Sequence, residues 1–101
     1  MMDYILVEHS EVEDEDDVEK VYSEIDENRK EHRRVEFYPS GLCFAYGGEH
    51  GHEEVLDTLP EDLHDLETDE YTKVRHVRPK IFEEIWNHAA ESTDSVMGLL
   101  L

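Results

Sequence analysis

The sequence has few basic residues, a single cysteine and no long apolar run. Only 9 of its 101 residues are Lys or Arg, against 28 Asp or Glu, so the formal net charge is −19. Binding to DNA or RNA phosphates requires clustered cations, and a chain this acidic repels polyanions over the screening length of physiological salt. We therefore expect neither direct nucleic-acid binding nor attachment to an anionic membrane surface.

The other absences bear on location. The apolar runs at residues 5–7 and 99–101 fall far short of the roughly 20 residues of a membrane span, and residues 1–10 lack the basic and apolar regions of a secretory signal. One cysteine, Cys43, allows no internal disulfide, in agreement with a reducing compartment. The sequence therefore predicts a soluble, cytoplasmic protein.

The clearest local pattern predicts a β-hairpin over residues 34–46. Two runs rich in aromatic and β-branched residues, 34–38 and 42–46, flank Pro39, Ser40 and Gly41. Pro39 fixes φ for a turn, and Gly41 can adopt the left-handed conformation that closes it. Apolar residues alternate along both runs, so one face of each strand can join the core. Cys43, within the second run, is expected to be a small buried side chain.

The remaining segments complete a predicted α+β fold in one domain, residues 1–101. Residues 4–9 and 71–77 predict strands, while 18–26 fit a strand and a helix equally well by spacing. Pro60 and the two acidic residues after it predict a short helical turn. The sequence predicts an amphipathic helix that begins at Pro79, and the apolar stripe of this helix is Ile81, Phe82, Ile85, Trp86 and Ala89. We expect a poorly ordered tail over residues 91–101. The helix is expected to pack on a small antiparallel sheet, a meander with the hairpin at its centre.

The acidic residues are concentrated in two segments that contain no Lys or Arg. Residues 8–19 hold eight carboxylates, and residues 49–70 hold ten more. The first segment has no apolar face and predicts a loop between ordered elements. A uniformly solvating surface does not require such segregation, whereas a complementary surface for a basic partner would, because opposite charges speed encounter and select the partner.

The candidate partner-binding residues are carboxylates from both segments, together with tyrosines that could act as anchors. Lasting affinity depends on aromatic or arginine anchors within a charged patch. The candidates are Glu13, Asp14, Glu15, Asp16, Asp17, Asp57, Glu61, Asp62, Asp65, Tyr22, Tyr38 and Tyr71. They predict a binding surface for a basic protein.

No pattern in the sequence indicates catalysis or a cofactor. His50 and His52, with Glu49, Glu53 and Glu54 beside them, could supply metal ligands, but a glycine-rich acidic loop explains them equally well, so no specific metal site is predicted. Paired carboxylates act as acid and base only where their environments separate their pKa values, which a solvated run does not do. Nucleophile elbows, phosphate loops and dinucleotide fingerprints are all missing. We expect a protein that is not an enzyme.

The stretch from Tyr22 onward resembles a family of short bacterial proteins. It has a Tyr-Ser-Glu-Ile-Asp run at 22–26, Arg-Arg-Val-Glu at 33–36, a glycine turn before Ala45 and Tyr46, and Phe-Glu-Glu-Ile-Trp at 82–86. That family is a domain of unassigned function which resembles the immunity proteins encoded beside polymorphic and contact-dependent toxins. The resemblance implies an antiparallel meander and a strand for residues 21–26. The matching residues Glu24, Asp26, Arg29 and Glu31 are expected to form a salt-bridged turn.

These observations lead to the hypothesis of an immunity-type inhibitor that binds a basic toxin domain, a nuclease, in the cytoplasm. A nucleic-acid mimic that blocks a DNA-binding or restriction protein is one alternative, and a halophilic acidic domain without a dedicated site is another. Carboxylates at phosphate-like intervals would favour the mimic, and a compact patch beside exposed aromatic rings would favour the toxin partner. Folding that requires molar salt would favour the halophilic domain.

Overall fold

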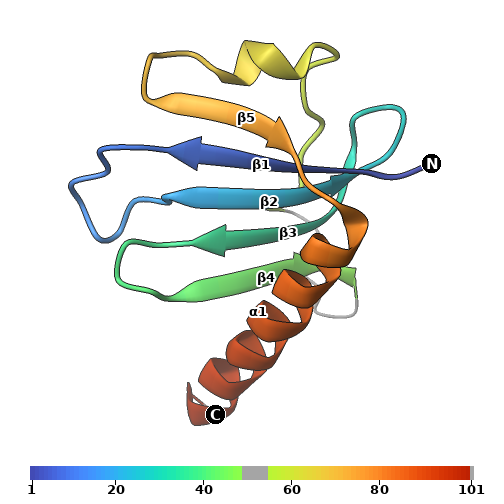
Figure 1. The fold of residues 1–101 in the computed structure, drawn as a ribbon. Coiled ribbons are helices and arrows are strands. Elements are labelled where there is room, and N and C mark those ends of the chain that lie inside the picture. Colours follow the sequence, from blue (N-terminus) through green and yellow to red (C-terminus); the bar gives the residue numbers. More distant parts are fainter. Residues whose placement is uncertain (49–54, 101) are drawn as a thin grey trace.

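Five antiparallel strands and one long helix form the structure shown in Figure 1. The computed structural model describes residues 1–48 and 55–100, with side chains as far as residue 91. The elements are β1 (Asp3–His9), β2 (Lys20–Ile25), β3 (Glu31–Phe37), β4 (Cys43–Gly47), the 3-10 helix η3 (Leu63–Leu66), β5 (Thr72–His76) and α1 (Pro79–Leu100). The strands make one sheet in the order β4-β3-β2-β1-β5, and all neighbours are antiparallel. The predicted α+β class and antiparallel sheet are confirmed. The hairpin of β3 and β4 lies at one edge of the sheet and not at its centre, because β5 joins the sheet beside β1.

Strands β3 and β4 form the predicted hairpin. The N–H of Tyr38 donates to the carbonyl of Leu42 at 2.9 Å, and the N–H of Gly41 donates to the carbonyl of Tyr38 at 2.9 Å. Gly41 has a φ of +93°, the left-handed conformation expected of it. Turn chemistry is local, which is why it could be recognised in the sequence.

Residues 20–25 form a strand, β2, as the family resemblance implied. Tyr22 pairs with Leu6 of β1 and with Val35 of β3, and its ring packs against the cluster under α1. Ile25 follows Tyr22 by an odd number of residues and therefore points to the opposite face of the sheet, where it is fully buried. Because β2 contributes apolar side chains to both faces, its pattern did not alternate cleanly, and spacing alone could not identify it.

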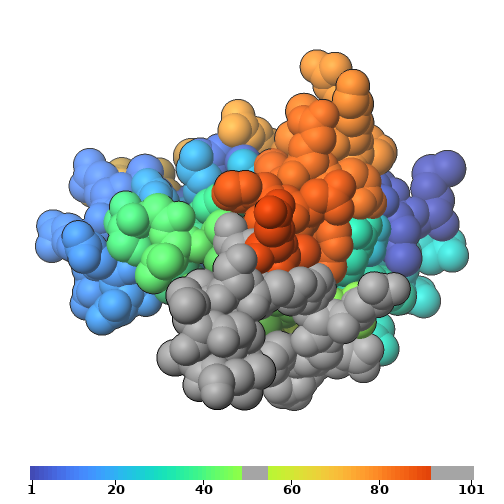
Figure 2. Space-filling model, turned by 90° about the horizontal axis from the view of Figure 1, so that it is seen from below, coloured from blue at the N-terminus to red at the C-terminus, as the bar shows by residue number. Residues whose placement is uncertain are grey.

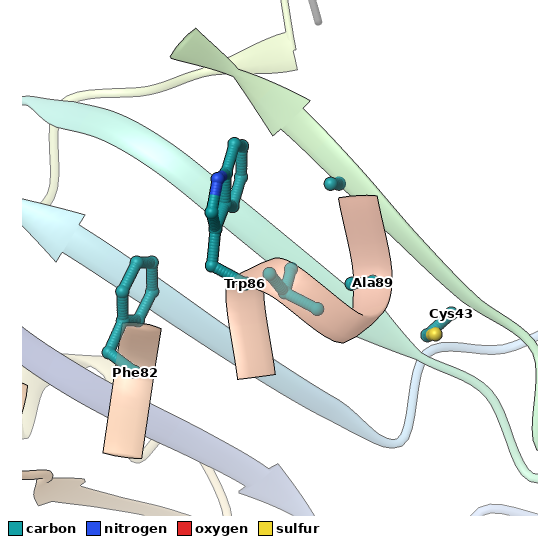
Figure 3. Packing of buried hydrophobic residues seen from close by; sticks show 6 residues of the cluster. Cys43, Phe82, Trp86 and Ala89 are labelled. Carbon is teal, nitrogen blue, oxygen red and sulfur yellow. The ribbon is translucent and has the colours of Figure 1, made fainter. Parts of the chain in front are cut away.

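Helix α1 covers one face of the sheet and buries Phe82, Trp86 and Ala89 there. Of the other two residues of the predicted apolar stripe, Ile85 is half-buried, and Ile81 is 41% exposed and lies outside the core. Figure 3 shows Phe82, Trp86 and Ala89 on the helix and Cys43 on β4. Cys43 is 6% exposed, so the prediction of a buried cysteine is confirmed. The buried strand residues of this cluster are Val35, Cys43 and Ala45. The small side chains on β4 leave room for the aromatic rings of the helix, and the larger Phe44 lies on the other face of the strand.

The opposite face of the sheet has a second apolar cluster. Ile5 and Ile25 pack against Leu63 of η3, and several half-buried residues surround them. This cluster lies over β1, β2 and β5 only. On β3, the residues that alternate with Val35 are the charged Arg34 and Glu36, so this half of the face is polar and aromatic.

The side chain of Asp26 holds the turn between β2 and β3. The salt-bridged turn expected of Glu24, Asp26, Arg29 and Glu31 is not formed among these four residues, because their ionic partners are Arg33, His32, Asp3 and Arg34. One carboxylate oxygen of Asp26 accepts the N–H groups of Asn28 and Lys30 at 2.8 and 3.1 Å, and the other lies 2.9 Å from Nε2 of His32. The contact with His32 lowers the pKa of Asp26. Arg29, with a positive φ of 67°, forms an ion pair with Asp3 at 3.5 Å.

A buried carboxylate ties the start of β3 to the segment after the undescribed residues. Glu31 is 1% exposed. It accepts hydrogen bonds from the hydroxyl of Ser23 at 2.6 Å and from the N–H of Asp57 at 3.0 Å, and it forms an ion pair with Arg34. Donors from three different parts of the chain therefore offset the cost of burying this charge.

Two predicted boundaries differ from the structure. The short helical turn begins at Leu63, with Asp62 as its N-cap, and not at Pro60. Helix α1 continues to Leu100, so residues 91–100 are helical in place of the poorly ordered tail that was expected. No proline follows Pro79 to interrupt the helix. None of the described helices has the length and apolar content needed to cross a membrane.

Candidate protein-binding surface

The predicted acidic loop connects β1 to β2 at one end of the sheet. Its ends are fixed by backbone hydrogen bonds of 2.8 Å, from His9 to Glu19 and from Glu19 to Phe37. Within it, the side chain of Asp14 accepts the N–H of Asp16 at 2.9 Å. We use the name acidic loop for residues 10–19. The turn inside the loop projects carboxylates that are all exposed, namely those of Glu13, Asp14, Glu15, Asp16 and Asp17.

These five carboxylates have no cationic partner among the described residues of the chain. The described arginines that form ion pairs do so with other carboxylates. Arg33 pairs with Glu24 and Glu83, Arg34 with Glu31 and Glu36, Arg29 with Asp3, and Arg75 with Glu8. Several negative charges held close together and left uncompensated produce a strong local potential. The acidic loop is therefore available to bind a positively charged group from outside.

The β3–β4 turn lies beside the acidic loop. Both are at the left of Figure 1, and in Figure 2 the blue atoms of the loop lie next to the green atoms of the hairpin. The rings of Tyr38 and Phe44 make an edge-to-face pair with centroids 5.9 Å apart, and Leu42 next to them is 54% exposed. Large apolar side chains thus border the carboxylates.

A cleft of about 370 Å³ separates the loop from the hairpin. Its lining combines carboxylates with apolar and aromatic side chains, from Glu15, Asp16, Tyr38, Ser40, Leu42 and Phe44. A second hollow of about 260 Å³ includes Tyr22 and Phe37 in its lining, and Tyr38 borders both. Clefts with an apolar lining and a few charged groups are typical of binding sites.

The phenol of Tyr38 is neutral at physiological pH, and burial moves its ionisation to still higher pH. Loss of solvent, together with the nearby carboxylate of Glu36, raises the pKa of Tyr38 to about 12. Its hydroxyl donates to Oε1 of Glu36 at 3.1 Å. The same causes raise the pKa of Tyr46. This part of the surface therefore presents uncharged aromatic rings beside ionised carboxylates.

The three predicted tyrosine anchors differ in exposure. Tyr71 is 43% exposed and directly precedes β5, where its carbonyl accepts the N–H of Ser10 at 2.8 Å. Tyr22 and Tyr38 are half-buried, and the ring of Tyr22 packs edge-to-face on Phe37 with centroids 5.7 Å apart. Tyr38 and Tyr71 thus lie at the end of the sheet that carries the acidic loop.

The structure does not bring the two predicted acidic groups together. The N–H of Asp57 binds Glu31, and the carbonyl of Glu61 accepts from Arg29 at 3.1 Å, so these residues lie near the β2–β3 turn. The six residues of β2 separate that turn from the acidic loop, a distance of about 20 Å. Asp65 lies in η3, and Asp62 precedes this helix as its N-cap and accepts the N–H of His64. The predicted carboxylates therefore do not form one continuous surface, because Asp57 and Glu61 lie away from the acidic loop.

Sequence reasoning missed Ser40, Leu42 and Phe44 as part of the surface. The alternation along β4 was visible, but either face of that strand could have joined the core. Leu42 and Phe44 were assigned no role because only the packing of α1 decides which face is covered.

The described part of the chain shows no candidate metal site. No three His, Cys, Asp or Glu side chains of residues 1–48 and 55–91 are grouped so that they could hold a metal ion. The candidate ligands His50 and His52, with Glu49, Glu53 and Glu54, lie outside the described residues. Cys43 is covered by α1.

Comparison with known proteins identifies a family. No curated protein and no solved structure matches the chain. One family matches residues 3–91, which include all five strands and the first half of α1. The chain therefore belongs to the family described as Domain of unknown function (DUF6881).

Proposed function

We propose that this protein is an immunity-type inhibitor that binds a basic toxin domain, a nuclease, through the acidic loop. The observation that carries the proposal is the set of five exposed carboxylates without a cationic partner in the described chain, placed beside a cleft with aromatic walls. The loop supplies charge, and the rings supply apolar contact area. Interfaces of high affinity combine these two features.

The proposed mechanism is occlusion by binding alone, in the cytoplasm of the cell that makes the toxin. A nuclease is basic where it holds phosphate groups, and carboxylates can occupy the phosphate positions. Attraction between the two surfaces would raise the association rate by a factor of about 10 to 1,000 at low salt. No chemical step is required of the inhibitor.

The compactness of the surface favours a dedicated partner over general mimicry of nucleic acid. The carboxylates of Glu13 to Asp17 are consecutive and occupy one short turn. The phosphates of one DNA strand follow a regular track with a rise of roughly 3.4 Å per residue. A single turn next to a cleft fits one protein surface better than it imitates such a track.

The test is the rate of association with the toxin domain encoded beside this protein, at salt concentrations of about 0.05 M and about 0.5 M. We expect the rate to fall at high salt. A loop variant with Glu13→Gln, Glu15→Gln, Asp16→Asn and Asp17→Asn should lose most of this salt dependence. Asp14 is kept because its side chain holds the turn.

A matched control changes the charge equally at other positions. Glu27→Gln, Glu70→Gln, Glu84→Gln and Glu91→Gln remove four exposed carboxylates that lie outside the acidic loop and are not among the candidate binding residues. We expect this variant to keep at least half of the wild-type rate. Equal losses in both variants would mean that overall charge and not the acidic loop drives association, and a rate indifferent to salt would remove the electrostatic mechanism.

A further inference from the structure

The molecule itself shows which groups hold an arginine side chain, at the mostly buried contact between the sheet and helix α1. The guanidinium of Arg33 lies 5.0 and 4.9 Å from the ring centroids of Phe82 and Trp86. Glu24 accepts from its Nε at 2.8 Å and from its Nη2 at 2.6 Å, and Glu83 accepts from its Nη1 at 3.2 Å. Two aromatic rings and two carboxylates thus bind one guanidinium by stacking and by hydrogen bonds.

The cleft beside the acidic loop has the same composition without the arginine. Its lining contains two aromatic rings, of Tyr38 and Phe44, and two carboxylates, of Glu15 and Asp16. No described Lys or Arg lines it. The two rings are nearly perpendicular, at 80°, whereas those of Phe82 and Trp86 are nearly parallel, at 14°. A guanidinium in this cleft would therefore stack on one ring and not lie against two.

The other lining residues suit the stem of an arginine side chain. Leu42, which is 54% exposed, offers apolar surface to methylene groups, and the hydroxyl of Ser40 can accept a hydrogen bond. A lysine would satisfy the carboxylates less well, because its ammonium is a compact, strongly hydrated charge that cannot form a planar pair with them. The volume of about 370 Å³ is ample for one such side chain.

We propose that this cleft binds an arginine side chain presented by the basic partner, and that it discriminates arginine from lysine. The inference rests on the proposed function, because it names the group with which a basic protein would enter the surface. The charge of the acidic loop attracts the partner from a distance, and the cleft then retains it through one arginine. The two steps involve different residues and can be separated experimentally.

The first experiment uses two blocked tripeptides, Gly-Arg-Gly and Gly-Lys-Gly, titrated into the whole protein and followed through backbone amide resonances. We expect the arginine peptide to shift the amides of Glu15, Asp16, Leu42 and Phe44, with an affinity about threefold or more above that of the lysine peptide. Equal affinities, or shifts spread over every acidic segment, would overturn the inference.

Variants with matched charge locate the site. Glu15→Gln with Asp16→Asn should weaken arginine-peptide binding by about tenfold, whereas Glu13→Gln with Asp17→Asn, an equal change of charge outside this cleft, should weaken it by about threefold or less. Leu42→Ser, at an exposed position, should weaken it without altering the fold. Equal effects of the two double variants would overturn the inference.

The same variants separate this inference from the proposed function. If toxin capture requires the acidic loop but is unaffected by Leu42→Ser, and the arginine peptide does not bind the cleft, the inference fails and the proposed function stands. If the arginine peptide binds the cleft but the toxin domain is not captured, the cleft is an arginine site and the proposed function fails.

Discussion

Arg33 of β3 stacks on Trp86 of α1, with its guanidinium carbon 4.9 Å from the ring centroid. Glu24, its neighbour on β2, and Glu83 of α1 accept its N–H groups. One side chain therefore joins two strands to the helix that covers them. In a chain with a net charge of −19, these pairs also place a cation between two carboxylates that would otherwise repel each other.

Removing Arg33 should strongly destabilise the fold. Arg33→Met leaves Glu24 mostly buried without its cation and removes the stacking on Trp86, so we expect the free energy of unfolding to fall by about 2–4 kcal/mol. Urea denaturation followed by the fluorescence of Trp86, the single tryptophan, measures it. Arg75→Met is the control, because the Arg75–Glu8 pair is exposed and should contribute less than about 1 kcal/mol. Similar losses in both variants would contradict the assignment.

The contribution of Glu24 to the free energy of unfolding should depend on pH. Hydrogen bonds from Arg33 lower the pKa of Glu24 in the folded protein. Folding therefore favours the ionised carboxyl, and the stability it adds is fully present above the ordinary value of 4.5 and is lost as the pH falls through the lowered value. Glu24→Gln should cost about 1 kcal/mol at pH 7. The difference from wild type should shrink below pH 4.5, and a difference that stays constant from pH 7 to about pH 3 would exclude this linkage.

Glu31 should control the attachment of the segment at Asp57. Its carboxylate accepts from Ser23, Arg34 and the N–H of Asp57, whereas an amide offers one acceptor oxygen and an NH₂ group that would face these donors. Glu31→Gln should therefore cost about 2–3 kcal/mol and speed hydrogen exchange at the amide of Asp57. The control is Glu36→Gln, which changes the other carboxylate on Arg34. Unchanged exchange at Asp57 in the Glu31 variant would refute the role.

The sheet and the hairpin could be predicted because their determinants are local. Pro39 and Gly41 fix the turn, and the aromatic and β-branched runs around them fix the strands. The burial of Cys43 was predicted from its residue type, but alternation alone did not decide which face of β4 is covered, since Cys43 and Phe44 are both apolar. The face that is covered depends on the size of Trp86, more than forty residues away, which packs against the small side chains of β4.

The acidic loop could be predicted from the charge pattern, but the aromatic side chains that lie beside it could not. The position of Tyr38 beside Glu15 follows from the order of β1 to β4 in the sheet, which brings the β1–β2 and β3–β4 connections to the same end. The same order sends Asp57 to the opposite end. Glu31 was expected in an ion-paired turn, but its burial also involves the N–H of Asp57, a donor far away in the sequence that no local pattern indicates.

Two glycines with similar backbone angles should respond differently to alanine. Gly41 and Gly47 have φ values of +93° and +90°. A Cβ on Gly41 would meet nothing within 4 Å, whereas one on Gly47 would lie 2.4 Å from the carbonyl oxygen of His32. Gly41→Ala should cost about 1–2 kcal/mol for the left-handed conformation alone, and Gly47→Ala should cost at least about 2 kcal/mol more. Chemical denaturation of both variants measures the difference, and equal costs would show that the backbone at residue 47 moves freely.

Neutralising the acidic loop should leave the stability of the fold intact. The side chains of Glu13, Glu15, Asp16 and Asp17 are exposed and have no ionic partner among the described residues. Replacing them with their amides should change the free energy of unfolding by about 0.5 kcal/mol or less at physiological salt, and should raise it slightly at low salt because self-repulsion falls. Urea denaturation at about 0.05 M and about 1 M salt tests this. A wild-type protein that folds only near molar salt would instead support the halophilic alternative, because its charge would then be an adaptation to solvent and not a surface for a partner.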